Sequence, residues 1–485
     1  MTLTHHDSEI EAGQSSQRAV TPGIVPGIVG VEMWERFSFY GMQAIMVYYL
    51  YATTTGIGLD KATATALMGA YGASVYLCTI AGGWVADRLF GAERTLLGGA
   101  VTLVIGHLAL SLIPGGWGVA IGLILVAIGS GVLKTSAITL LGQAFPVEDD
   151  ARRDSAFQLF YLGINVGALL GPLLTGWLAT TRGYHVGFAA AAVLMVIGLV
   201  YYLAFRRKFI HPELLRPQNP ISNSSPLILA SVALLAVIGV ATLVTTGTIG
   251  LDSLATILLV ATLAVTAALF AQMLASKDVT GAEKRRVVAY LPLFFASCAF
   301  WSVLNQTYGV LAVYSDVRLD RTIGSFTIPA SWTQSLNPFY ILVLSLPLAW
   351  LWRRIPNLNS PTKMGLGVII SGSGLLVLLP FTGSGANSTP FLALAGATLI
   401  ITLGELLVGP VGMSATTAYA PQAFATRFSA LYFLTMAIGT ATAGVLSKYY
   451  NSESASAETT YFLSCSLVVM TIGAIVFFIS RKAHH

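Results

Sequence analysis

Fourteen apolar runs, each about as long as a bilayer-spanning helix, restrict the folds open to this chain more than any other feature. A hydrocarbon core about 30 Å thick requires about 20 apolar residues per helix. The chain is 55% hydrophobic and only 10% charged over 485 residues, whereas soluble domains are about 25% charged. We therefore predict an all-α integral membrane protein. The runs lie at about 27–51, 63–89, 94–113, 117–145, 156–180, 186–205, 226–246, 252–275, 288–314, 333–352, 364–381, 388–416, 426–447 and 459–480.

The runs fall into groups of six, two and six, which predicts two six-helix bundles with two additional helices between them. An even number of spans places both termini on one side of the membrane. With that side assigned to the cytoplasm, nineteen of the 26 basic residues lie inside and five outside, as the positive-inside rule requires. The predicted parts are a tail at 1–25, a bundle at 26–205, the extra helices at 206–287, a second bundle at 288–480 and a tail at 481–485.

Composition and motifs give no sign of an enzyme. The three cysteines lie in apolar segments without metal-ligand spacing, and there is no phosphate loop or nucleophile elbow. We expect no cofactor, no metal and no catalytic residues. The net charge of +5 reflects basic loops that set topology and contact lipid headgroups, so we expect no nucleic-acid partner.

Five charged residues interrupt the apolar runs: Glu32, Glu35, Arg36, Lys134 and Glu405. A charge at mid-bilayer costs about 2.5 to 3.5 kcal/mol on insertion scales, so such residues usually form pairs, ion sites or proton relays. Three acids facing two bases leave one carboxylate without a cation. This surplus predicts a transporter that couples its substrate to H+.

The first helix brings most of these charges together. On a helix, Glu32 stands four residues before Arg36, the favourable order for an ion pair. One carboxylate could neutralise Arg36 while the other exchanges a proton. Burial raises the pKa of a carboxyl group and a nearby cation lowers it, so movement of the cation could load or release H+. A purely structural ion-pair cluster is the alternative.

Small residues recur along the fifth run, at Gly163, Gly167, Gly171 and Gly176 together with Pro172. Such a stripe lets helix backbones approach closely in lipid. Close packing is therefore the interpretation we favour. A similar stripe marks proton-coupled drug antiporters, which leaves that alternative open.

A loop motif follows the second run, where residues 82–94 read GGWVADRLFGAER. It resembles the conserved cytoplasmic loop of the major facilitator superfamily. The resemblance implies that fold, and a role for Asp87 and Arg88 at the cytoplasmic gate. Gly91 suits the tight turn that the loop needs.

Four further stretches resemble the proton-dependent oligopeptide transporter (POT) family, in its bacterial form with fourteen helices. Residues 32–41 read EMWERFSFYG, similar to the family motif ExxERFxYYG, and 160–167 read FYLGINVG, similar to FYxxINxG. Lys134 in GVLK and Glu405 in GEL match the lysine of the fourth helix and the glutamate of the tenth. The matches run through nearly the whole chain in order.

The resemblance implies a substrate cavity at the midplane between the two bundles. Glu405 would face a peptide ammonium, and Lys134 with Arg36 would face the peptide carboxylate. Four other residues would form hydrogen bonds to the peptide backbone: Tyr40, Tyr76, Asn165 and Asn337. Two more, Trp301 and Tyr432, would form walls of the side-chain pockets.

Two positions depart from the family pattern. Many members carry an arginine where this chain has Gln43 and an acidic residue where it has Asn305, and those charges are thought to pair across the extracellular gate. With both neutral, neither charge is left buried alone. We expect a hydrogen bond between Gln43 and Asn305 in place of the ion pair.

The predicted function is proton-coupled symport of di- and tripeptides by alternating access, with Glu32, Glu35 and Arg36 coupling the protons. We expect a multi-pass protein of the bacterial inner membrane, with cytoplasmic termini, lipid around it and a functional monomer. Two alternatives stay open: a proton-coupled transporter of another small zwitterion or a drug, including an antiporter, and a peptide sensor that does not transport.

Overall fold

The computed structural model describes residues 20–145, 149–210, 246–354 and 359–482, together with positions 217, 239, 242 and 243. Thirteen of the fourteen predicted runs correspond to helices in this part of the chain. The run at about 226–246 lies almost entirely outside the described residues. The prediction of an all-α membrane protein is confirmed.

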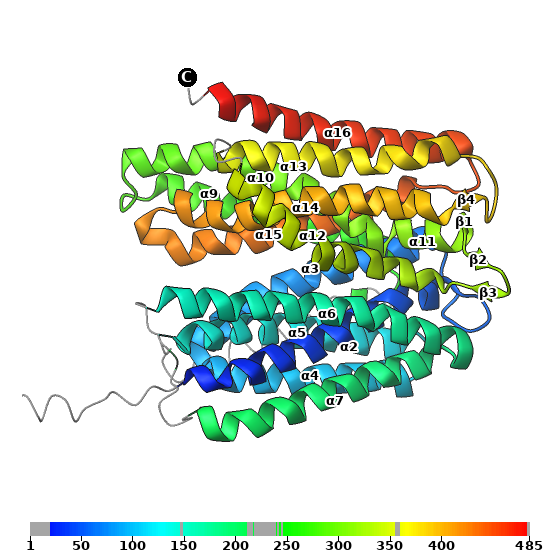
Figure 1. The fold of residues 1–485 in the computed structure, drawn as a ribbon, viewed down its shortest axis with the longest axis horizontal. Helices are drawn as coiled ribbons and strands as arrows, with labels where there is room; N and C mark the ends of the chain where they lie inside the picture. The colour runs from blue at the N-terminus through cyan, green and yellow to red at the C-terminus, as the bar shows by residue number, and fades with distance from the viewer. Residues whose placement is uncertain are drawn as a thin grey trace, which may run out of the picture.

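The helices form two bundles that lie side by side, with α2 to α7 in one half of Figure 1 and α10 to α16 in the other. The first bundle contains α2 (Val25–Tyr51), α3 (Lys61–Val85), α4 (Ala92–Leu112), α5 (Gly115–Gln143), α6 (Asp150–Arg182) and α7 (Tyr184–Phe209). The second contains α10 (Gly281–Leu304), α11 (Val310–Val317), α12 (Leu336–Arg354), α13 (Ser360–Gly374), α14 (Phe391–Tyr419), α15 (Ala425–Leu446) and α16 (Ala455–Lys482).

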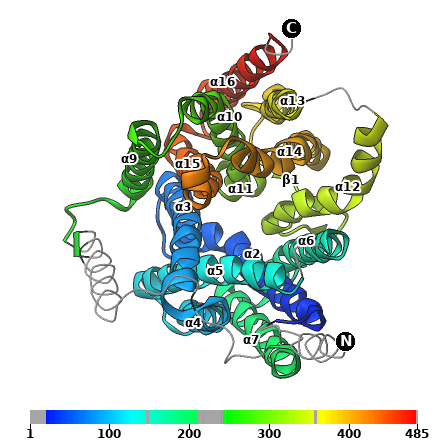
Figure 2. The same ribbon diagram turned by 90° about the vertical axis from the view of Figure 1, so that its left-hand side faces the viewer.

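The remaining described helix, α9 (Leu254–Ala275), packs on the outside of α3 and α15 (Figure 2). Its charge-free apolar sequence suits a surface exposed to lipid on most sides. Eleven helical stretches of the described chain are long and apolar enough to cross a membrane. The helix α2 is long enough as well, but it carries the three charges of the predicted proton site.

Short strands and 3-10 segments gather at one end of the bundles, which we call the strand end (Figure 1). Here β1 (Leu319–Asp320) pairs in parallel with β4 (Thr389–Pro390), and β2 (Thr322–Ile323) forms a hairpin with β3 (Phe326–Thr327). The start of α2 and the last turn of α16 both lie at the opposite end, in different bundles. The 3-10 segments used below are η5 (Asn305–Tyr308), η6 (Ala330–Ser335) and η7 (Leu375–Phe381).

The prediction of one continuous helix at 288–314 is wrong, because this run contains two helices. The helix α10 ends at Leu304, η5 follows, and α11 starts again after Gly309. Polar side chains at Asn305 and Gln306 and the glycine at 309 weaken the helix locally. The side chain of Gln306 accepts a 2.7 Å hydrogen bond from the Tyr461 hydroxyl of α16, which fixes the interruption in place.

Glycines bring α6 into backbone contact with α2. A Cβ atom on Gly171 would lie 2.5 Å from the carbonyl oxygen of Phe37 and 2.8 Å from the nitrogen of Gly41. A Cβ atom on Gly167 would lie 2.8 Å from the nitrogen of Phe37. These approaches exclude any larger residue, as expected where small residues set the crossing of membrane helices. The stripe on the fifth run therefore packs helices, as we favoured.

Candidate functional site

The charged side chains of α2 form one buried cluster. The Nε of Arg36 lies 2.5 Å from Oε2 of Glu35 and 3.2 Å from Oε1 of Glu32. Among the described residues, neither oxygen of Glu32 has a partner with hydrogen-bond geometry. Both carboxylates therefore share a single guanidinium, and Glu32 is the one held only by charge.

A serine on α5 completes this cluster. The hydroxyl of Ser130 donates a 2.7 Å hydrogen bond to Oε1 of Glu35 and accepts one of 3.2 Å from Arg36. The sequence analysis missed Ser130. Its spacing of four residues from Lys134 on one helix face was the signal that could have found it.

Lys134 belongs to the same electrostatic cluster. It interacts by charge with Glu32, Glu35 and Arg36, and its side chain is half-buried. The first bundle thus holds two cations and two carboxylates close together. Glu405 lies in the second bundle, outside this cluster, and is therefore the third acid, the one that the two cations do not neutralise.

Glu405 lies on α14 and is held by α12. The side-chain nitrogen of Asn337 donates a 2.6 Å hydrogen bond to Oε2 of Glu405 and also contacts Thr402 at 3.0 Å. Three tyrosines of the first bundle lie within electrostatic range of this carboxylate: Tyr40, Tyr76 and Tyr161. These interactions place Glu405 on the side of the second bundle that borders the first.

Aromatic rings occupy the region between the two sets of charges. The guanidinium carbon of Arg36 lies 5.1 Å from the ring centre of Phe39 and 5.9 Å from that of Tyr40, within the range of cation–π attraction. Tyr40 in turn stacks on Tyr308 of η5, with ring centres 6.1 Å apart. The sequence analysis did not select Tyr308.

The other predicted pocket residues differ in their surroundings. Tyr432 lies within electrostatic range of Glu405, and its hydroxyl contacts the Gly409 carbonyl at 3.4 Å. Trp301 is buried, and its indole nitrogen has no partner among the described residues. The amide of Asn165, in contrast, donates to the Tyr161 carbonyl of its own helix at 2.9 Å. That bond does not use the second amide hydrogen or the carbonyl oxygen of Asn165, so the peptide contact stays a prediction.

Gln43 and Asn305 line one small cavity that is enclosed by α2, α3, η5 and α15, and it has room for about one water molecule. The expected hydrogen bond between them is wrong for this structure. The nitrogen of Asn305 donates to the Trp301 carbonyl at 2.8 Å, and Oε1 of Gln43 is unpartnered within the described chain. Asn305 therefore bonds within its own helix and does not reach Gln43.

Asp87 and Arg88 follow α3 in a π-helical segment, η2 (Ala86–Phe90). The segment ends at Gly91, whose φ of +79° favours glycine. Asp87 is half-buried and Arg88 is exposed. Their role at a gate stays a prediction.

Hydrogen bonds join the two bundles near the strand end. Tyr48 of α2 donates to the Ala312 carbonyl at 3.2 Å, and Tyr51 donates to Oδ2 of Asp316 at 2.6 Å. From the other side, Trp332 of η6 donates to the Leu173 carbonyl of α6 at 3.0 Å. The bundles are therefore closed against each other at this end.

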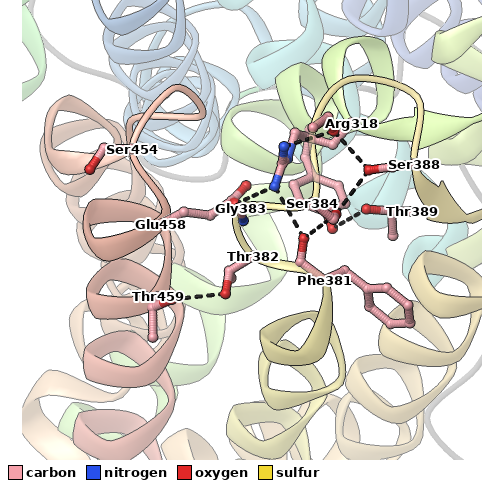
Figure 3. A network of polar contacts seen from close by, with 12 residues as sticks. Arg318, Phe381, Thr382, Gly383, Ser384, Ser388, Thr389, Ser454, Glu458 and Thr459 are labelled. Atoms are coloured by element: carbon pink, nitrogen blue, oxygen red, sulfur yellow. Dashed lines mark hydrogen bonds and ion pairs between the residues drawn. The ribbon is translucent and has the colours of Figure 1, made fainter.

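A buried ion pair holds α11 within the second bundle (Figure 3). A guanidinium nitrogen of Arg318 lies 2.8 Å from Oε2 of Glu458 on α16 and donates to the Phe381 carbonyl at 3.1 Å. The other terminal nitrogen donates to the Gly385 carbonyl at 2.7 Å. One guanidinium thereby ties the end of α11 to α16, to the end of η7 and to the loop that follows η7.

Comparison with known proteins agrees with this architecture. The pattern of the POT family matches residues 93–463. The chain belongs to the POT family. It is 36% identical to the di-/tripeptide transporter of Lactococcus lactis subsp. cremoris over 470 residues, which cover 93% of each chain. It is also 36% identical over 459 residues to the uncharacterized transporter YclF of Bacillus subtilis (strain 168), which cover 93% of this chain and 92% of YclF.

A solved POT structure has the same fold. A mutant of the peptide transporter POT in complex with alafosfalin superposes with a TM-score of 0.88 at 34% identity, covering 94% of both chains. These findings confirm the predicted major facilitator fold and POT membership. As a POT protein, the chain is a multi-pass membrane transporter and not an enzyme.

Proposed function

We propose that this POT protein imports di- and tripeptides together with protons by alternating access between its two bundles. The observation that carries the proposal is the separation of charge across the midplane. Arg36 and Lys134 lie in the first bundle, while Glu405 faces the first bundle's tyrosines from the second. A zwitterion with an ammonium at one end and a carboxylate at the other matches this arrangement. The L. lactis relative, named a di-/tripeptide transporter, supports the same substrate class.

The buried cluster on α2 supports proton coupling. Two carboxylates lie within 3.2 Å of one guanidinium nitrogen, so both cannot be neutralised fully by it. A proton on Glu32 or Glu35 would relieve the repulsion between the carboxylates. Movement of Arg36 toward a peptide carboxylate would then alter how strongly that proton is held.

The proposed orientation places the strand end outside and both termini in the cytoplasm, in the inner membrane of a bacterium. Basic residues support it, since Arg206, Arg207 and Lys208 close α7 and Arg481 and Lys482 close α16. We also propose the domain boundaries given above and a functional monomer.

Counterflow in proteoliposomes tests the transport proposal. Vesicles loaded with unlabelled dialanine should accumulate labelled dialanine transiently without a proton gradient. An inward proton gradient should then drive concentrative uptake. Binding without exchange would favour a peptide sensor, and exchange of drugs but not peptides would favour the drug-transport alternative.

N-acetylation of the dipeptide tests the role of Glu405. Loss of the ammonium should weaken competition by about 1.5 to 3 kcal/mol, the scale of a hydrogen bond to a charged group. The variant Glu405→Gln should lose most of this discrimination. Glu453→Gln, on an exposed loop, is the control and should keep it. Equal competition by acetylated and free peptide in the unmodified protein would remove Glu405 from this role.

A further inference from the structure

Tyr308 lies in the interruption between α10 and α11. It shares η5 with Asn305 and is followed by Gly309, after which α11 begins. Because Gln306 in the same segment is bonded to Tyr461 of α16, η5 is fixed against the second bundle. The side chain of Tyr308 is therefore presented from a short, anchored segment and not from a continuous helix.

One face of the Tyr308 ring borders the charged site. It stacks on Tyr40 with ring centres 6.1 Å apart and planes inclined by 23°. Tyr40 contacts Arg36 by its ring at 5.9 Å. Tyr308 also lies within electrostatic range of Tyr76 and Glu405. Groups proposed to bind both ends of the peptide thus lie near this one side chain.

Tyr308 also lines the small cavity that is bordered by Gln43 and Asn305. Beyond the cavity, toward the strand end, Tyr48 and Tyr51 bond α11 and close the bundles. Tyr308 therefore separates the charged site from the cavity beneath the closed end. The structure records no hydrogen bond from its hydroxyl to a described residue, so its contribution here comes from the ring.

We infer that Tyr308 is a specificity-determining residue that forms the strand-side wall of the peptide site and limits peptide length. The inference rests on the proposed function. Each added residue lengthens an extended peptide by about 3.3 to 3.6 Å, and a rigid ring between site and cavity leaves no such space in that direction. Removing the ring would join the cavity to the site.

The test compares a dipeptide with a tripeptide, dialanine and trialanine, in proteoliposome exchange. Tyr308→Leu should raise the tripeptide-to-dipeptide ratio of kcat/KM by at least about threefold, a modest change for a pocket side chain. Tyr308→Trp should lower the ratio, since a larger ring shortens the site. Tyr308→Phe retains the ring and should leave the ratio within about twofold.

A matched control removes an equivalent stack away from the site. Phe205 and Phe209 of α7 stack with ring centres 6.4 Å apart and planes inclined by 27°. Phe209→Leu should leave the ratio unchanged even if it lowers the yield of folded protein. A ratio is insensitive to the amount of active protein, so a merely structural role for Tyr308 would not move it.

Two results would overturn the inference. If Tyr308→Leu and Tyr308→Trp both exchange peptides with the ratio of the unmodified protein, Tyr308 does not limit length. That result leaves the proposed function intact. If the unmodified protein exchanges no peptide, the proposed function fails and this inference fails with it.

Discussion

The hydroxyl of Tyr51 donates a 2.6 Å hydrogen bond to Oδ2 of Asp316, which joins α2 of the first bundle to α11 of the second. The same carboxylate lies 3.3 Å from a guanidinium nitrogen of Arg321. Arg321 also donates to the Ile328 carbonyl at 2.8 Å. This contact between the bundles is therefore a charge-assisted hydrogen bond, and it lies about two helical turns along α2 from the neutral Gln43.

Loss of the Tyr51 hydroxyl should open the strand end. A hydrogen bond to a charged group contributes about 1.5 to 3 kcal/mol, which corresponds to a shift of about tenfold or more in the open population. In a variant with the native cysteines replaced, Thr440→Cys places a thiol in the cavity near Gln43. A membrane-impermeant maleimide should label it faster in Tyr51→Phe.

Tyr450→Phe is the matched control for this experiment. The hydroxyl of Tyr450 also donates to a buried carboxylate, Glu458, at 3.0 Å, but both residues lie in the second bundle. Its loss should not change labelling from the strand end. Equal labelling rates in Tyr51→Phe and the unmodified protein would show that this contact does not hold the closed state.

Neutralising either acid of α2 should separate exchange from gradient-driven uptake. Glu32→Gln and Glu35→Gln each remove one of the carboxylates proposed to bind the proton but leave the bundles and the cation proposed to face the peptide. Concentrative uptake in a proton gradient should fall to background, while counterflow survives. Glu93→Gln serves as the control, since Glu93 pairs with Arg206 outside this cluster. Normal concentrative uptake by both α2 variants would exclude these acids as the proton carriers.

The neutral gate pair can be examined by restoring its charges. Gln43→Arg or Asn305→Glu alone introduces one poorly compensated charge next to a nearly closed cavity, and each should slow transport. The double variant should recover much of the loss, because the two charges would meet across that cavity. A double-mutant cycle measures the coupling. Strictly additive losses would mean that the residues never approach each other during the transport cycle.

Breaking the Arg318–Glu458 pair should lower stability strongly. Removal of one partner from a buried pair typically costs about 3 to 5 kcal/mol, so Glu458→Gln should reduce the thermal stability of the purified protein markedly. The partly exposed pair of Lys448 and Asp252 gives the comparison, where Lys448→Met should cost about 1 kcal/mol or less. The double variant Arg318→Met with Glu458→Leu should regain part of the loss. No difference between the two single variants would contradict the structural role shown in Figure 3.

Hydropathy and local spacing predicted much of the fold and part of the site. Thirteen apolar runs located the fourteen described α-helices, two of which lie in one run, and the four-residue spacing brought Glu32 next to Arg36. The interruption at Asn305–Tyr308 was missed because only a few polar residues and one glycine distinguish it from a continuous apolar helix. Membrane helices tolerate such residues when a neighbour bonds them, and Tyr461 is that neighbour, 155 positions further on.

Contacts between distant parts of the chain could not be predicted in this way. Ser130 lies one helical turn from Lys134, which makes it a candidate, but only the crossing of α5 with α2 shows that it bonds Glu35. Likewise, Tyr51 and Asp316 are separated by 265 residues. Gln43 and Asn305 were predicted to bond directly, but Asn305 bonds its own helix first, because a local carbonyl is always within reach.

The backbone contact between α2 and α6 has a consequence for how distances change during transport. Gly167 and Gly171 leave no space for α6 to slide along α2 past Phe37 and Gly41. Glu32 and Glu35 must therefore move with α6 as parts of one rigid unit. Spin labels on these two helices should keep a constant separation through the cycle, whereas their separations from α11 should switch between two values.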